Sequence, residues 1–110
     1  MVLKCELIII LIKVMTKDVI TKLEKIIDQR KEMESTNSYV ASLLNKGKVK
    51  IANKLGEEAV ETVTAYLSQK DSEIVEESAD LIFHLLVLLK SSNISFDDVL
   101  KVLEKRMKND

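Results

Sequence analysis

The stretch Glu76–Leu89, which reads EESADLIFHLLVLL, decides the fold of this chain. Eight of the nine residues from Leu81 to Leu89 are apolar, so a helix over them is apolar around nearly its whole circumference. One small bundle cannot bury such a helix on every side. We therefore expect an all-α fold, a helical bundle completed by homodimerisation, with this helix at the centre of the combined core.

The rest of the chain also has a helical pattern. Its 110 residues are 46% hydrophobic and 32% charged, a globular composition of single-domain size. There is no proline, there are two glycines, and apolar residues recur at three- and four-residue steps. This periodicity predicts helices over residues 16–34, 39–45, 48–68, 72–90 and 95–107. Thr16 or Asp18, Ser38 and Ser95 are the expected N-caps, and Gly47 is the expected end of the second helix.

Residues 1–14 differ from the rest. They hold the most apolar run, Leu7–Ile12, which is shorter than the roughly 20 residues that span a bilayer and lacks a signal-peptide pattern. We expect no membrane partner. Met15-Thr16-Lys17-Asp18 resembles the opening of a helix, and we interpret Met15 as the natural start. The predicted domain is residues 15–110, and residues 1–14 are a hydrophobic extension that forms a short strand or helix packed on the bundle, or an oligomer contact.

Charge and cysteine content exclude several classes of protein. The formal net charge of -1 provides no field for nonspecific nucleic-acid binding, so no nucleic-acid partner is expected. Cys5 is the only cysteine and His84 the only histidine, which excludes an internal disulfide framework and a Cys/His zinc site. A reducing, cytoplasmic location fits best.

Two groups of acids interrupt helices that otherwise look apolar. At about 100° per residue, one stripe of the third predicted helix carries Lys50, Lys54, Glu57, Glu58 and Glu61. One side of the fourth carries Glu73, Glu76, Glu77, Asp80 and His84. The short connection makes the two helices antiparallel neighbours. If the two stripes face each other, four or five carboxylates converge.

Converging carboxylates raise one another's pKa or force the helices apart unless a cation neutralises them. Oxygen ligands favour a hard metal, Mg²⁺ or Mn²⁺, and Mg²⁺ is typically held by a few carboxylates while it bridges a substrate phosphate. Lys50 and Lys54 beside the acids therefore indicate phosphate chemistry. The competing interpretation is a solvated helix face with i,i+4 ion pairs. Asp80 fits that interpretation least, because it directly precedes the apolar run.

Three other features are individually weak. His84 is either a core or interface histidine or a group that orients a metal ligand from outside the coordination sphere. It does not fit a di-iron bundle site, which needs two Glu-x-x-His pairs. Ser38 is interpreted as an N-cap, Tyr39 as a core residue and Gly47 as a helix C-cap.

Three blocks in this order closely resemble the phosphoribosyl-ATP pyrophosphatase family of histidine biosynthesis, within the all-α, MazG-like superfamily. They are Ser38–Gly47 (SYVASLLNKG), Lys54–Glu61 (KLGEEAVE) and Glu77–Leu89 (ESADLIFHLLVLL). The resemblance covers roughly Val19 to Arg106. It implies Mg²⁺-dependent hydrolysis of phosphoribosyl-ATP to phosphoribosyl-AMP and pyrophosphate, in a homodimer or higher homo-oligomer.

The resemblance also implies roles for particular residues. Glu58, Glu61, Glu77 and Asp80 match the family acids and are the expected metal ligands, directly or through water. Glu57 matches a further catalytic acid, either an outer group or the base that positions water. The expected substrate contacts are Lys54, then Lys50 and Lys46, with Ser38.

Two alternatives remain at this level. A housecleaning pyrophosphatase of the same superfamily, acting on noncanonical nucleoside triphosphates, would share the four acids but not the Ser38-Tyr39 and Lys-Gly-Glu-Glu blocks. A non-enzymatic helical dimerisation module would carry the same acids as a salt-bridged surface.

Overall fold

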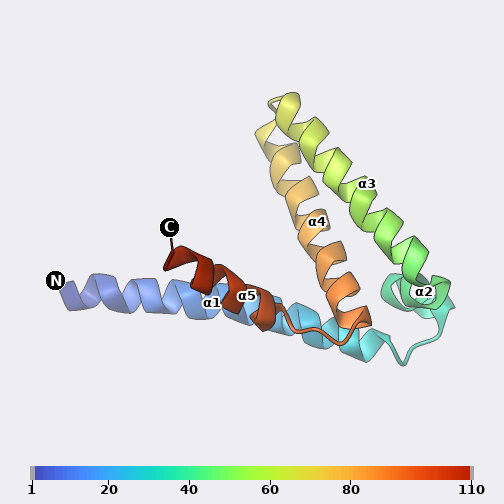
Figure 1. Ribbon diagram of the computed structural model, residues 1–110, viewed down its shortest axis with the longest axis horizontal. Helices are drawn as coiled ribbons and strands as arrows, with labels where there is room; N and C mark the ends of the chain where they lie inside the picture. Colours follow the sequence, from blue (N-terminus) through green and yellow to red (C-terminus); the bar gives the residue numbers. More distant parts are fainter. Residues whose placement is uncertain (1, 110) are drawn as a thin grey trace.

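The described part of the chain is helical, as the three- to four-residue periodicity predicts. The computed structural model describes the backbone of residues 2–109 and the side chains of residues 6–8, 10–11 and 19–109. Within these limits the elements are α1 (Val2–Arg30), the 3₁₀ turn η1 (Ser35–Asn37), α2 (Tyr39–Lys46), α3 (Lys48–Leu67), α4 (Asp71–Ser91) and α5 (Phe96–Met107) (Figure 1). No strand occurs over residues 2–109, so the all-α expectation is confirmed.

Helix α1 differs from its expected bounds at both ends. It begins at Val2 and passes through Thr16 and Asp18, so the prediction of an N-cap at either residue is wrong. The reason is that no proline or glycine separates the apolar run from the amphipathic part. The helix ends at Arg30 rather than at residue 34, because the amides of Glu32 and Met33 donate to carbonyls only three residues back, which closes the helix in a tight turn.

The N-terminal half of α1 extends away from the α3–α4 hairpin (Figure 1). Leu7, Ile8, Ile10 and Leu11 are all more than half exposed. The expectation that this segment packs on the bundle is therefore wrong for its described side chains. Its role as an oligomer contact and the choice of Met15 as the natural start stay predictions.

The predicted bounds of the other helices hold to within one residue. Ser38 caps α2 by accepting a hydrogen bond from the Ala41 amide at 3.3 Å. Gly47 separates α2 from α3 with a φ of 94°, a left-handed conformation that strongly favours glycine. Ser95 caps α5, its side chain accepting from the Asp97 amide at 3.2 Å.

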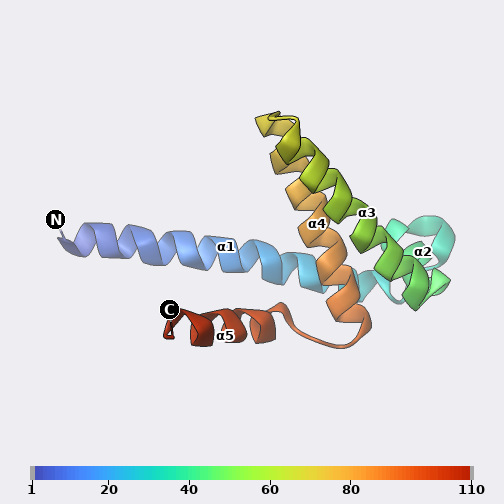
Figure 2. The same ribbon diagram turned by 45° about the horizontal axis from the view of Figure 1, so that its top comes forward.

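Helices α3 and α4 form an antiparallel hairpin, which Figure 2 shows from a second direction. The hairpin rests on the C-terminal half of α1 and on α2, where the core lies. The buried core consists of Ile27, Val40, Leu43, Ile51, Leu86 and Val87. The far end of the hairpin stands clear of this core (Figure 2). The acidic stripes lie on its two arms.

The single chain is not a closed bundle. Its radius of gyration is 16.6 Å, against about 13 Å for a compact domain of this length. In the apolar run of α4, Leu86 and Val87 are fully buried, while Ile82 is 43% exposed. The inability of one chain to bury this helix was the reason for expecting a homodimer, which stays a prediction.

Among the described residues, no single helix is long and apolar enough to span a bilayer. Only α4 and α5 taken together, across a bend of 110°, reach the required length and composition.

Candidate metal and phosphate site

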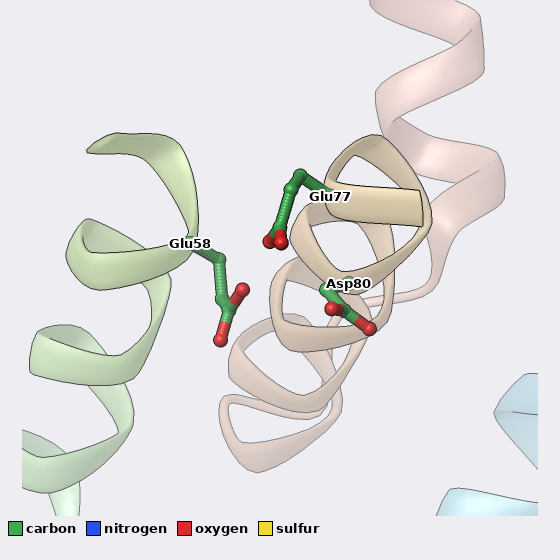
Figure 3. A group of neighbouring side chains, drawn as sticks. All are labelled: Glu58, Glu77 and Asp80. Carbon is green, nitrogen blue, oxygen red and sulfur yellow. The ribbon is translucent and has the colours of Figure 1, made fainter. Parts of the chain in front are cut away.

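Three carboxylates meet between the two arms of the hairpin. Glu58 projects from α3, and Glu77 and Asp80 project from successive turns of α4 (Figure 3). One ligand atom from each lies within 4.8 Å of the other two. Glu58 is buried, Glu77 is half-buried and Asp80 is exposed, so the group opens from the helix interface towards solvent.

Glu61 lies beside this group, one helical turn after Glu58. A hydrogen bond with the Glu61 carboxyl is the largest effect on Glu77, and together with partial desolvation and the neighbouring charges it raises the pKa of Glu77 to about 7. Burial, and next the contact with Glu61, raise the pKa of Glu58. Without a cation, Glu58 and Glu77 therefore hold their protons at a higher pH than ordinary glutamates do.

The chemistry of this donor set fits a hard divalent cation. Glu58 Oε2 and Glu77 Oε2 are buried and accept no hydrogen bond. Buried carboxylate oxygens without a donor are costly, and a cation that takes oxygen ligands satisfies both at once. The residues expected to bind metal are thus brought together by the fold, with Glu61 at the edge of the closest three.

Lys54 places a positive charge directly against the acids. Its Nζ lies 3.1 Å from Glu57 Oε2 and 3.7 Å from Glu58 Oε1. The hydrogen bond from Lys54, and then its charge, lower the pKa of Glu57, and Lys50 one turn earlier adds to this effect. The lysine therefore spans from the exposed Glu57 to the buried Glu58, within reach of an anion bound at the acids.

The remaining expected substrate contacts lie on α2 and at the start of α3. Ser38 is at the N-terminus of α2, where its hydroxyl caps the helix. Lys46 is the last residue of the same helix, eight positions away and exposed, so about 12 Å of helix separates the two. A single phosphate group cannot contact both.

Thr62 is a residue of the site that the helical arithmetic did not identify. Its hydroxyl lies 2.7 Å from the carbonyl of Glu58 and 3.1 Å from that of Glu77, so it joins α3 to α4 beside the acids. One signal for this role was present in the sequence, because Thr62 is a hydroxyl residue that directly follows Glu61 of the acidic stripe.

Tyr39 and His84 form a second unexpected feature. The hydroxyl of Tyr39 and Nε2 of His84 are 2.9 Å apart, and Nδ1 of His84 lies 2.7 Å from the carbonyl oxygen of Asp80. The interpretation of Tyr39 as a core residue is wrong, because it is 52% exposed. It stands on the first turn of α2, where its hydroxyl and one side of its ring contact the buried His84.

Four clustered carboxyl groups with an adjacent lysine define a class of site, a carboxylate centre suited to a divalent cation and a phosphate, on an all-α hairpin. The family model described as phosphoribosyl-ATP pyrophosphohydrolase matches residues 20–107. Because this match covers most of the chain, the chain belongs to that family.

Curated relatives agree with this assignment. The phosphoribosyl-ATP pyrophosphatase of Metallosphaera sedula is 52% identical over 91 residues, 83% of this chain and 98% of that protein. The protein of the same name from Saccharolobus islandicus (strain L.S.2.15) is 44% identical over 94 residues, 86% of this chain and all of that protein. A histidine biosynthesis bifunctional protein HisIE from Buchnera aphidicola is 43% identical over 91 residues, 83% of this chain and 44% of that protein.

Proposed function

We propose that this chain hydrolyses phosphoribosyl-ATP to phosphoribosyl-AMP and pyrophosphate, a step of histidine biosynthesis, at a cation held by the hairpin. The family and the names of its relatives support the reaction. The structural observation that supports the site is the meeting of Glu58, Glu77 and Asp80 within 4.8 Å, with two buried oxygens left without a donor.

The proposed cation ligands are Glu58, Glu61, Glu77 and Asp80, directly or through water. A bound Mg²⁺ or Mn²⁺ supplies neutralisation of phosphate charge and a lowered pKa for coordinated water. Thr62 holds the two helices at the level of these ligands, so their separation is set before substrate binds. Lys54 contacts a phosphate of the substrate, with Lys50 and Lys46 along the same chain of phosphates.

Two roles were expected for Glu57, as an outer group or as the base that positions water. Its ion pair with Lys54 lowers its pKa, which makes it a weaker proton acceptor. We therefore favour a role in holding Lys54 in place over a role as general base. Ser38, whose hydroxyl is engaged in capping α2, acts by placing the first turn of that helix beside the site.

The cytoplasmic location, the homodimer and the absence of nucleic-acid or membrane partners are part of the same proposal. They rest on the balanced charge, the lone cysteine and the incompletely buried α4.

The testing experiment is release of pyrophosphate from phosphoribosyl-ATP by the full chain, with Mg²⁺, with Mn²⁺ and with EDTA. We expect turnover only with metal. A parallel panel of deoxynucleoside triphosphates tests the housecleaning alternative, and faster turnover of any of these would replace the proposed substrate. A chain that is neither stabilised by Mg²⁺ nor active would instead be a dimerisation module.

A further inference from the structure

Tyr39 combines an exposed ring with a hydroxyl that makes one hydrogen bond. Tyr39 is the first residue of α2, directly after the capping Ser38. Its hydroxyl forms a hydrogen bond with His84, which is only 6% exposed. Its ring lies 6.3 Å from Phe83 in a stacked arrangement and 5.8 Å from His84 edge-on. These contacts hold the orientation of a residue that remains 52% exposed.

The hydrogen-bond chemistry of His84 determines what the Tyr39 hydroxyl offers. The Asp80 carbonyl only accepts, so Nδ1 of His84 carries a proton. In the neutral imidazole this makes Nε2 the acceptor, and Tyr39 donates its hydroxyl proton to it. The Tyr39 oxygen then presents only lone pairs to a ligand.

The position of this hydroxyl is at the edge of the proposed cation site. Burial raises the pKa of Tyr39, Lys54 opposes the rise, and the carboxylates of Glu58, Glu57 and Asp80 add to it. The geometry gives the same location, because Nε2 of His84 lies 2.9 Å from the Tyr39 hydroxyl and Nδ1 of His84 lies 2.7 Å from the carbonyl oxygen of Asp80. Tyr39 is therefore joined through one side chain to a proposed metal ligand.

A group that offers lone pairs and an aromatic face is complementary to a nucleoside rather than to a phosphate. Phosphate oxygens are themselves acceptors and are repelled by the lone pairs. Ribose hydroxyls and purine amino groups donate, and a purine ring stacks on an aromatic face. The ammonium group of Lys54 beside the acids suits the phosphates instead.

We propose that Tyr39 is a substrate-contacting residue that binds the nucleoside part of the substrate, and that His84 is the positioning residue that fixes its orientation. This inference rests on the proposed function, since it assigns the part of the nucleotide that the cation and the lysines do not hold.

The experiment measures binding of phosphoribosyl-AMP, which lacks the pyrophosphate group, by isothermal titration calorimetry, beside steady-state kinetics with phosphoribosyl-ATP. For Tyr39→Ala we expect product affinity to fall about tenfold, within the range of one base–aromatic stack. KM should rise by the same factor while kcat stays within about twofold, because a contact equal in ground and transition states changes only KM. Affinity for inorganic pyrophosphate should not change.

Further variants separate contact from scaffold. Tyr39→Phe keeps the ring and should lose roughly threefold in product affinity. His84→Leu should weaken product binding even though His84 does not contact the ligand, because the orientation of Tyr39 is lost. His84→Gln retains a donor and an acceptor and should restore part of the product affinity. Tyr66→Ala is the matched control, because Tyr66 on α3 is 68% exposed. This variant should leave the affinity for phosphoribosyl-AMP and the KM for phosphoribosyl-ATP unchanged.

The outcomes distinguish this inference from the proposed function. A wild-type chain that releases no pyrophosphate overturns both. An active wild type with unchanged product affinity in Tyr39→Ala, or a change only in oligomer size by light scattering, overturns the inference alone. If Tyr39→Ala fails to fold, Tyr39→Phe decides, and product affinity equal to wild type in that variant overturns the hydroxyl contact.

Discussion

Two charged clusters, one near the C-terminus of α4 and one in its N-terminal half, differ in how their carboxylates are paired. Near its C-terminus, Lys90 Nζ lies 2.9 Å from Asp28 Oδ2 on α1, and Lys31 Nζ donates to the Lys90 carbonyl at 2.8 Å. Partial burial acts to raise the pKa of Asp28. The hydrogen bonds and the positive charges of Lys90 and Lys31 outweigh this effect, so the pKa of Asp28 is lowered. The negative charge of Asp28 is therefore balanced by lysines of the chain itself.

In the N-terminal half of α4 and the facing part of α3, Glu77 and Glu58 have raised pKa values and buried oxygens without partners. The first cluster pairs its carboxylate with lysines and joins two helices, whereas the second leaves two buried carboxylate oxygens without a hydrogen-bond donor. The comparison supports the proposed cation site, because the paired carboxylate has a lowered pKa, whereas the carboxyl groups of the proposed site have raised pKa values.

The largest expected effect is the loss of activity when the carboxylate of Asp80 is removed from the acidic cluster. Asp80→Asn should lower metal-dependent pyrophosphate release more than about 100-fold, beyond the usual cost of losing an outer-sphere partner. Asp28→Asn, the matched control, should keep activity within about twofold. Steady-state kinetics on both variants checks this, and full activity in Asp80→Asn would remove the metal-site assignment.

The second largest effect is the expected stabilisation of the fold by Mg²⁺ bound at the acidic cluster. At a Mg²⁺ concentration 100 times its dissociation constant, the wild type should gain about 2.7 kcal/mol of stability, or roughly 10 °C in Tm. Asp80→Asn should show no such gain and should melt above the wild type in EDTA, because a repulsive charge is gone. Thermal denaturation followed by circular dichroism measures both, and an equal Mg²⁺ response in the variant contradicts the assignment.

The pH dependence of the metal-free protein should follow the raised pKa values. The folded chain holds a proton on Glu77 up to about pH 7, whereas the ordinary pKa is 4.5, so between these values the folded state binds more protons than the unfolded state. Stability from this group is therefore complete below pH 4.5 and is lost as the pH rises to about 7.

Melting in EDTA across that range tests this expectation. Tm should fall with rising pH, and Glu77→Gln should flatten the fall. With Mg²⁺ the trend should reverse, since deprotonated ligands bind metal better. A wild-type Tm that rises steadily with pH in EDTA would contradict the raised pKa values.

The smallest expected effect is the loss of stability when Asp28 is removed from its ion pairs with Lys90 and Lys31. Asp28→Ala should lower the free energy of unfolding by about 1 kcal/mol or less, because Asp28 is partly exposed and water screens its ion pairs. The loss should be independent of Mg²⁺ and smaller at high salt. Urea denaturation with and without Mg²⁺ measures it, and a Mg²⁺-dependent loss would join the two clusters functionally.

Much of the local structure follows from residue type alone. Ser38 and Ser95 cap the helices for which they were predicted, and Gly47 occupies a left-handed position. Short-range hydrogen bonding and backbone sterics decide such features, so neighbours in the sequence suffice. The end of α1 was misplaced because its last turn depends on where η1 and α2 must begin.

The amino-acid sequence by itself determined the all-α class and the two acidic stripes, because helical periodicity places residues on faces without reference to the rest of the chain. Only the tertiary structure decided that Thr62 joins the stripes, that Glu58 is buried while Asp80 is exposed, and that Tyr39 bonds His84. The physical reason is that these contacts join α3 or α2 to α4, and their distances depend on how the helices pack.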